Sequence, residues 1–312
     1  VLCSGHNHNG TLSYKFYVEK RKNGGVRMKP KKKIALMIVL IIIAVMMSLP
    51  FFWMLITSIK PDTELFSWPP SFIPKNITLE HYAEVFHTKD FGRYFANSLI
   101  VACLSVVINL FFCSLAGYAF ARLDFKGKNF AFIVLLSTMM IPIQVTLIPT
   151  FILVKSFPLA GGNNIFGQGG IGFLNSYFGL AVPHIMSVFG VFIMRQFYMQ
   201  FPKELSEAAR IDGANEIRIF TRIFLPLGKP ALSTLAIFSF TQAWDDFLWP
   251  LIVTSENSMR TLQLGLEVFK SRSSADWGPL MACTSLAIVP VLIIFTVLQK
   301  YFTDTALTSG IK

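Results

Sequence analysis

The residues of this chain that could do chemistry are few, and two of them are neighbouring carboxylates inside an apolar stretch. Asp245 and Asp246 follow Gln242 and Trp244 within residues 241–250, Thr-Gln-Ala-Trp-Asp-Asp-Phe-Leu-Trp-Pro. A carboxylate within a membrane-spanning helix costs about 2.5–3.5 kcal/mol on insertion scales, so it normally faces a polar cavity or a partner. We therefore expect Gln242, Trp244, Asp245 and Asp246 to line a polar path or its external mouth. The alternative is that both carboxylates lie in water at the external end of a helix.

Two further polar side chains lie in apolar stretches. Gln144 stands between Pro142 and Pro149. Broken helices at membrane depth are tolerated where they line a cavity, so we predict that Gln144 lines the same path. The alternative for Gln144 is a hydrogen bond between helices. His184 follows Pro183, and we expect it to be a hydrogen-bonded packing residue, with a proton relay as the alternative.

The chain lacks the patterns of an enzyme or a nucleotide-binding protein. The phosphate-binding pattern G-x-x-x-x-G-K-[ST] is absent, and the glycine-rich residues 155–176 do not supply it. We interpret that stretch as a flexible or ligand-side external loop. Cys3, Cys103, Cys113 and Cys283 form no C-x-x-C pair, and no soluble segment carries a catalytic or metal-spaced set. We therefore predict no catalytic residue, no metal site and no disulfide.

Composition places the chain in a membrane. Of its 312 residues, 53% are hydrophobic and 14% are charged. Apolar runs of about 20 residues predict membrane-spanning helices, and continuous runs favour helices over a β-barrel, whose strands alternate. The predicted fold class is an all-α integral membrane protein. Its six transmembrane helices are expected at about 34–59, 97–121, 129–154, 177–199, 231–253 and 279–299.

The distribution of charge gives the orientation. If the N-terminus is cytoplasmic, 20 of the 28 Lys and Arg fall in cytoplasmic segments and eight in external ones. This asymmetry follows the positive-inside rule and predicts that both termini are cytoplasmic. The net charge of +11 then reflects topology, and we expect no nucleic-acid partner. Residues 28–312 are interpreted as the six-helix domain. Residues 1–27, which lack an apolar signal-peptide core, are interpreted as a disordered tail or as upstream sequence preceding a start at Met28.

Residues 200–230, here called the 200–230 loop, form the longest polar, charge-rich segment in the second half of the chain. Apolar runs precede and follow it, so it is predicted to lie outside the bilayer. Glu207 sits near the start of a first short helix, where the helix dipole favours negative charge. Gly213 permits the left-handed conformation that ends a helix. A second helix is predicted from about Ala214 to a stop before Pro226.

This loop resembles the EAA signature of ABC-importer permeases, E-A-A-x3-G-x9-I-x-L-P. The signature is matched at Glu207, Ala208, Ala209, Gly213, Ile223, Leu225 and Pro226. Residues 115–122, Leu-Ala-Gly-Tyr-Ala-Phe-Ala-Arg, and the closing Gln-Lys-Tyr-Phe at 299–302 also resemble sugar-type permeases. So does Trp-Asp-Asp-Phe at 244–247, where Asp245 replaces the usual Asn, a departure that bears on ligand contacts and protonation. The resemblance covers about residues 34–312.

The resemblance implies the permease subunit of a type I ABC importer of the maltose-type, carbohydrate family in a bacterial cell membrane. The loop would then be the coupling helix that docks on a cytoplasmic ABC ATPase dimer, where ATP and Mg are bound. A second homologous permease subunit would complete the path, an extracellular solute-binding protein would deliver the sugar, and membrane lipid would surround the spans. The residues expected to couple to the ATPase are Glu207, Ala208, Ala209, Gly213, Ala214, Ile223, Leu225 and Pro226, and those expected to line the translocation pathway are Gln144, Gln242, Trp244, Asp245 and Asp246.

Three alternatives remain open at this point. The loop could be a solvated amphipathic helix without a partner. The chain could be an ion- or proton-coupled secondary transporter that uses Asp245, Asp246 and His184 as a relay, although this leaves the loop unexplained. A membrane-embedded enzyme is the third alternative, and it lacks a convergent catalytic set.

Overall fold

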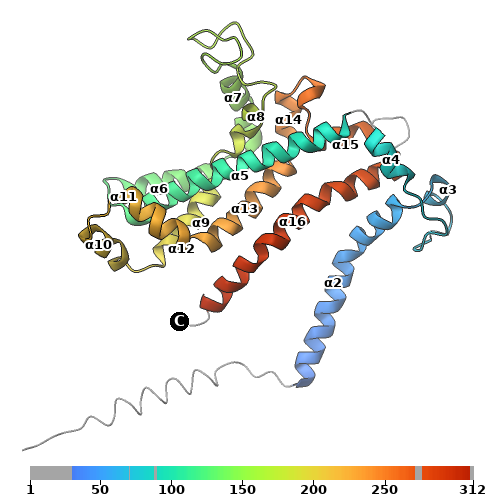
Figure 1. The fold of residues 1–312 in the computed structure, drawn as a ribbon, viewed down its shortest axis with the longest axis horizontal. Coiled ribbons are helices and arrows are strands. Elements are labelled where there is room, and N and C mark those ends of the chain that lie inside the picture. Colours follow the sequence, from blue (N-terminus) through green and yellow to red (C-terminus); the bar gives the residue numbers. More distant parts are fainter. Residues whose placement is uncertain (1–29, 70, 88–89, 271–275, 310–312) are drawn as a thin grey trace, which may run out of the picture. The chain divides into compact units, whose positions relative to one another are not determined.

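The computed structural model describes residues 30–69, 71–87, 90–270 and 276–309. The regular secondary structure of these residues is helical, with no strand among them, as the predicted fold class requires (Figure 1). The interpretation of residues 1–27 falls outside the described ranges. The helices are α2 (Pro30–Ser58), α3 (Asp62–Leu65), α4 (Glu80–His87), α5 (Phe91–Arg122), α6 (Lys128–Ser137), η1 (Thr138–Met140), α7 (Ile143–Lys155), α8 (Tyr177–Ala181), η2 (Val182–His184), α9 (Val188–Met199), α10 (Glu204–Ile211), α11 (Glu216–Ile219), η3 (Phe220–Phe224), α12 (Leu225–Leu227), α13 (Lys229–Trp244), α14 (Leu248–Val253), η4 (Asn257–Met259), α15 (Leu262–Lys270) and α16 (Trp277–Ser309).

Among the described residues, three helices are long and apolar enough to cross a bilayer unbroken: α2, α5 and α16. The chain divides into two compact units between Trp53 and Met54, a boundary that falls within α2, and α5 and α16 belong to the second unit. The three helices coincide with the predicted first, second and sixth spans. α2 and α16 continue through Pro50 and Pro290.

The other predicted spans are bent or broken. α6 with η1 meets α7 at 103°, and the α8–η2 pair meets α9 at 54°. Pro142 stands before α7 with a β-region backbone (ψ 138°), which a helix interior does not adopt. Counting each bent pair as one span, the described residues hold up to six spans by length and composition.

The predicted fifth span, 231–253, is wrong as a single helix. α13 ends at Trp244, and α14 begins only at Leu248. In the break, the Asp246 carboxylate accepts a hydrogen bond from the Trp249 N–H at 3.2 Å, which offers the backbone an alternative to the helical ladder. Asp245 and Asp246 interrupt the apolar run at this point, and α13 ends at these carboxylates, as in the alternative interpretation given for them above. At its other end α13 meets the helix Glu216–Leu227 at a 77° bend.

The predicted stop before Pro226 is also wrong. α11 begins at Glu216 rather than Ala214, and the helix continues through Pro226 in α12. Directly before this proline, η3 is a π-helix. A π-turn widens the helix and shifts its hydrogen-bond register, so the ring and missing N–H of proline are accommodated. The chain turns two residues later, at Gly228, where an added Cβ would lie 2.9 Å from the Tyr198 hydroxyl.

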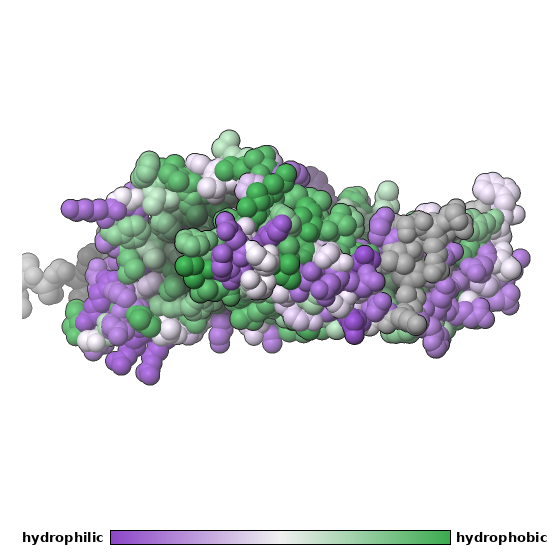
Figure 2. Space-filling view, turned by 90° about the horizontal axis from the view of Figure 1, so that it is seen from above, coloured by the Kyte–Doolittle hydropathy of each residue, from purple (hydrophilic) through white to green (hydrophobic). Residues whose placement is uncertain are grey.

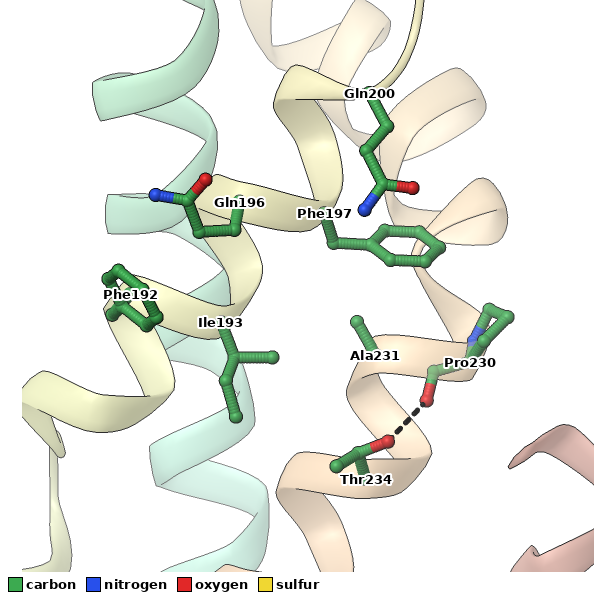
Figure 3. A pocket seen from close by; sticks show the side chains of 8 residues that line it. All are labelled: Phe192, Ile193, Gln196, Phe197, Gln200, Pro230, Ala231 and Thr234. Carbon is green, nitrogen blue, oxygen red and sulfur yellow. Dashed lines mark hydrogen bonds between the residues drawn. The ribbon is translucent and has the colours of Figure 1, made fainter. Parts of the chain in front are cut away.

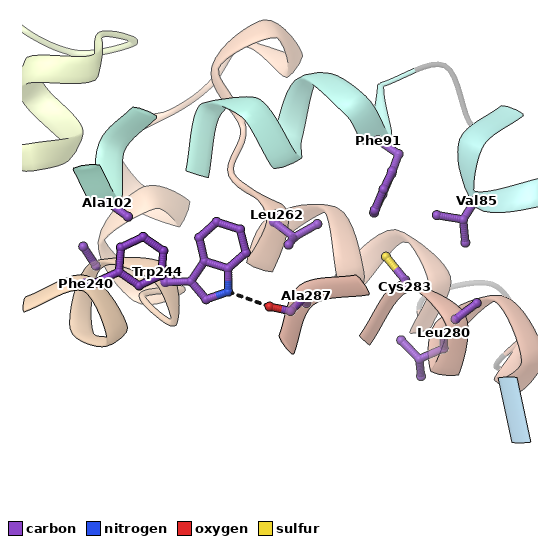
Figure 4. Packing of buried hydrophobic residues seen from close by; sticks show 11 residues of the cluster. Val85, Phe91, Ala102, Phe240, Trp244, Leu262, Leu280, Cys283 and Ala287 are labelled. Carbon is purple, nitrogen blue, oxygen red and sulfur yellow. Dashed lines mark hydrogen bonds between the residues drawn. The ribbon is translucent and has the colours of Figure 1, made fainter. Parts of the chain in front are cut away.

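Buried side chains form separate clusters along the second unit. One cluster joins α4, α5, α13, α15 and α16 and includes Trp244 (Figure 4). The Trp244 ring stacks on Phe240 at 5.6 Å, and its indole N–H donates to the Ala287 carbonyl at 3.0 Å. A second cluster, here called the loop cluster, packs α5 and α9 against the 200–230 loop.

Much of the remaining surface is apolar. Apolar side chains cover large areas of the face in Figure 2, and hydrophilic ones lie among them and at both ends. On the predicted spans, Val107, Phe111 and Ile148 are all more than half exposed. A water-soluble protein rarely exposes so much contiguous apolar area, so these side chains are suited to lipid or to a partner helix.

Candidate functional site: the 200–230 loop and its contacts with α5

The 200–230 loop begins with α10, whose two faces differ. Glu207 and Ala208 are exposed, whereas Ala209 on the other face packs against the loop cluster. Leu205 is 37% exposed and Ile211 is 87% exposed. α10 therefore presents both a carboxylate and apolar side chains away from the rest of the protein.

Gly213 ends α10. Its φ is +79°, a value that side-chain-bearing residues disfavour and glycine adopts freely. A Cβ at this position would meet no atom within 4 Å, so glycine is needed for its backbone conformation and not for space. Two backbone hydrogen bonds close the turn, from Gly213 N to Arg210 O and from Ala214 N to Ala209 O, both 3.0 Å.

The later signature residues lie in the helix that leads to α13. Ala214, Ile223 and Leu225 are half-buried against the loop cluster, and Pro226 is exposed. Asn215 caps α11 by accepting the Arg218 N–H at 2.9 Å. The structure thus divides the predicted coupling residues into an exposed set on α10 and a set that packs the loop onto the transmembrane helices.

A chain of hydrogen bonds joins α5 to α10. The Tyr118 hydroxyl donates to Glu216 Oε2 at 2.7 Å, and Arg210 Nε donates to Glu216 Oε1 at 2.7 Å. The hydrogen bond to Glu216 raises the pKa of the Arg210 guanidinium, so this group stays charged. Tyr118 and Glu216 are 98 residues apart in the sequence.

Arg122 makes a second connection at the end of α5. Its guanidinium donates to the backbone carbonyls of Tyr198, Phe201 and Pro202, where α9 ends and the loop begins. The same group lies 4.8 Å from the centre of the Phe224 ring. Sequence reasoning did not assign a role to Tyr118, Glu216 or Arg122. Tyr118 and Arg122 belong to the Leu-Ala-Gly-Tyr-Ala-Phe-Ala-Arg stretch, whose resemblance to sugar-type permeases was a sequence signal that could have pointed to these two residues.

The two helices that flank the loop leave a groove between them. It has a volume of about 300 Å³ and is lined by Phe192, Ile193, Gln196 and Phe197 of α9, by Gln200 directly after α9, and by Pro230, Ala231 and Thr234 of α13 (Figure 3). The Thr234 hydroxyl donates a hydrogen bond to the Pro230 carbonyl at 3.1 Å. On this face α9 and α13 are therefore not packed solidly together, which leaves them room to change their separation.

The two aspartates at the break after α13 have different environments. Asp246 is 17% exposed, and its Oδ2 lies 3.1 Å from Nε2 of the buried His184. Asp245 is exposed, and its Oδ1 accepts a hydrogen bond from Gln263 Nε2 at 3.5 Å. The pair His184–Asp246 thus joins the break to η2, while Asp245 is available to solvent or a ligand.

The other residues expected to line the pathway are also divided. Gln242 and Gln144 are exposed, on α13 and in the first turn of α7. Trp244 is only 2% exposed and lies within a core cluster, so it does not line an open surface in this structure. The large apolar ring is buried and its N–H donates to the Ala287 carbonyl, so a pathway role for Trp244 stays a prediction that this structure does not test.

The glycine-rich residues 155–176, expected to be a flexible or ligand-side loop, contain several internal hydrogen bonds. The Asn163 amide donates to the carbonyls of Lys155 and Phe157 at 2.8 and 3.0 Å and accepts from Gly170 N at 2.8 Å. Asn175 ties the end of this segment to Ser255 through the hydrogen bond from Ser255 N at 2.8 Å.

Comparison with known proteins decides the family. Residues 113–305, more than half of the chain, match the family described as "Binding-protein-dependent transport system inner membrane component". This chain belongs to that family. As an inner membrane component it is a multi-pass membrane protein and the permease subunit of an ABC importer, which explains the EAA signature and sets aside the secondary-transporter and enzyme alternatives.

Individual relatives extend over nearly the whole of this inner membrane component. The arabinooligosaccharides transport system permease protein of Bacillus subtilis is 34% identical over 90% of this chain and 96% of its own length. The diacetylchitobiose uptake system permease protein of Streptomyces coelicolor is 32% identical over 80% of this chain and 87% of its own. A solved bacterial ABC transporter involved in import of the acidic polysaccharide alginate has a similar fold, with a TM-score of 0.72 at 24% identity over 88% of this chain and 98% of that one.

Proposed function

We propose that this inner membrane component carries a sugar or oligosaccharide across the cell membrane, driven by a separate cytoplasmic ATPase dimer that docks on α10. A second homologous permease subunit completes the path, and an extracellular solute-binding protein delivers the sugar. The relatives whose names specify arabinooligosaccharides and diacetylchitobiose support the carbohydrate class.

The observation that carries the ATPase contact is the exposed face of α10. Ile211 is 87% exposed and Ile217, just after the turn, is 73% exposed. Both lie in a segment whose charge predicts that it faces water, where an exposed apolar side chain contributes no hydrophobic stabilisation. Together with Glu207 and Ala208, these residues form a small apolar surface with a carboxylate, which suits a protein cleft.

The energy source must lie on another subunit, because the sequence contains no phosphate-binding G-x-x-x-x-G-K-[ST] pattern. ATP with Mg is therefore placed on the partner ATPase. Closure of the ATPase pair around ATP would displace α10. Such a displacement shifts the permease between inward and outward states only if the contacts differ in the two states.

The polar residues of the predicted pathway suit a polyhydroxylated ligand. Carboxylates accept hydrogen bonds from hydroxyl groups, and Asp245 is exposed at the break that follows α13. Gln242 and Gln144 can both donate and accept. We assign these three side chains to ligand contact and Asp246, held by His184, to the shape of the break.

The test is reconstitution of the complete importer, with copurification of the ATPase and uptake of labelled oligosaccharide as readouts. Glu207→Lys reverses the charge on the exposed face of α10 and should abolish both ATPase association and uptake while membrane insertion is retained. Glu80→Lys makes the same charge change in the external α4, where the side chain is also exposed, and should leave association intact. Wild-type ATPase association in the Glu207→Lys protein would contradict the proposal.

A panel of ligands then addresses the substrate class. Uptake of an arabino- or chito-oligosaccharide supports the carbohydrate assignment, whereas ATP-dependent uptake of a phosphorylated polyol or an amino acid alone would overturn it and leave the ATPase contact standing.

A further inference from the structure

The 200–230 loop is connected by the chain to α9 and α13 only. A displacement of α10 would therefore be expected to move these two helices, the fourth span and the start of the fifth. The hydrogen bonds of the loop, however, lead to α5, which the sequence places about 80 residues earlier.

The first of these connections is the chain of groups from Tyr118 through Glu216 to Arg210. Both of its hydrogen bonds measure 2.7 Å, and a hydrogen bond to a carboxylate is about twice as strong as one between neutral groups. Tyr118 is 2% exposed, and its ring lies 5.3 Å from Phe220 and 5.2 Å from Phe224. The hydroxyl is thus directed at Glu216 by a packed ring that cannot turn freely.

The second connection is Arg122, one helical turn further along α5. Its three carbonyl partners are the last residues of α9 and the first of the loop. Since a guanidinium presents its donors in a fixed fork, it sets where the chain leaves α9. The loop is therefore attached to α5 at two places, by Arg122 at its start and by Tyr118 at Glu216, shortly after Gly213.

The backbones of α5 and α9 lie close together beside the first of these contacts. A Cβ at Gly117, the residue before Tyr118, would lie 2.5 Å from Met194 Cβ and 2.9 Å from Arg195 N, closer than real Cβ contacts. Tyr118 therefore stands where α5 packs directly against the part of α9 that leads into the loop.

We propose that Tyr118 is a positioning residue that transmits the displacement of α10 to α5, through Glu216, and that Arg122 holds the loop in register for this transfer. α5 then moves with α9 and α13 when the ATPase closes. This inference rests on the proposed function. It adds a path of transmission that the chain connectivity alone does not provide.

The experiment uses the complete importer in proteoliposomes, where solute uptake and ATP hydrolysis are measured on the same preparation. Tyr118→Phe removes only the hydroxyl and keeps the ring in the loop cluster. The ATPase should copurify as with the wild type, but the number of solute molecules imported per ATP should fall about tenfold, the factor that corresponds to ~1.4 kcal/mol of lost coupling.

Tyr177→Phe is the matched control. Its hydroxyl donates to Asn97 Oδ1 of α5 at 2.8 Å, so the variant removes a similar hydrogen bond from the same helix near its other end. We expect it to retain the wild-type ratio of uptake to hydrolysis.

Variants of Glu216 test whether Tyr118 and Glu216 act together. Glu216→Gln keeps an oxygen that Tyr118 can bond and loses the charge that Arg210 requires, so its loss should be smaller than that of Tyr118→Phe. Adding Tyr118→Phe to Glu216→Ala should lower the ratio little further, because both remove the same contact. Additive losses would overturn the proposal.

The outcomes separate this inference from the proposed function. If no ATPase copurifies with the wild-type protein, the proposed function fails. If the ATPase copurifies and Tyr118→Phe keeps the wild-type ratio, or loses assembly and uptake in proportion, then Tyr118 is a packing residue only and this inference alone is wrong.

Discussion

Replacing Gly213 with alanine would test whether the turn after α10 sets the docking surface. The φ of +79° costs an L-residue about 1–2 kcal/mol. No atom lies within 4 Å of the added Cβ, so the whole effect is backbone strain and none of it is a clash. If the strain disfavours only the docking-competent conformation, the apparent affinity for the ATPase falls about fivefold to thirtyfold.

Two substitutions at Gly213 should differ in how much ATPase affinity they lose. Gly213→Asn should lose less affinity than Gly213→Ala, because asparagine visits the left-handed region several-fold more readily. Affinity can be measured by titrating the purified ATPase onto the permease in nanodiscs, with thermal stability recorded on the same samples.

Gly127 provides the matched control. It has a φ of +80°, with no atom within 4 Å of an added Cβ, in the turn before α6. Gly127→Ala therefore carries the same strain outside the 200–230 loop, and we expect a similar loss of thermal stability with unchanged ATPase affinity. Equal losses of affinity in Gly127→Ala and Gly213→Ala would refute the reasoning, as would wild-type affinity in Gly213→Ala.

Three further predictions concern packing and pH. Gly117→Ala places a Cβ at 2.5 Å from a neighbouring side chain and should destabilise the detergent-solubilised protein by about 1–3 kcal/mol, whereas Gly92→Ala, with nothing within 4 Å, should not lower the melting temperature. Trp244→Ala removes a ring that is 2% exposed and should cost about 3–5 kcal/mol by the same thermal assay. Hydrogen bonds, chiefly the one from the Lys75 N–H, lower the pKa of the Glu64 carboxyl below its usual value of 4.5. The ionised carboxylate therefore stabilises the external segment above pH 4.5, and this contribution is lost as the pH falls through the pKa of the folded state. The protection factor of the Lys75 amide, which is the observed exchange rate compared with the intrinsic rate at the same pH, should therefore fall in acid, and Glu64→Gln should show no such dependence.

The sequence was sufficient for the apolar spans and for the position of the 200–230 loop. Hydropathy records whether a segment can lie in lipid, and the EAA signature is a local pattern with fixed spacing. Gly213 could be assigned to a helix end because only glycine adopts a positive φ without strain. These features depend on residues that are close in sequence.

The errors arose where long-range contacts or local hydrogen bonds decide the geometry. The break between α13 and α14 falls at Asp245 and Asp246, but the apolar residues on both sides of them led to the prediction of one continuous span. The helix that continues through Pro226 depends on the preceding π-turn, which has no simple sequence signal. The hydrogen bond between Tyr118 and Glu216 joins residues 98 positions apart, and a single sequence without aligned relatives carries no sign of such a pair.

Adjacent in the sequence, the two aspartates were given one role, but the structure gives them two. Asp246 accepts the Trp249 N–H at 3.2 Å and its other oxygen lies 3.1 Å from His184, so both oxygens have a partner and the position of the carboxylate is fixed. Asp245, one residue earlier, makes a long 3.5 Å contact with Gln263 and is exposed. One side chain is thus held inside the break and the other lies outside it. The carboxylate outside is the one that stands where the resembling permeases have asparagine, and it is therefore the position at which this chain can differ from them in what it binds.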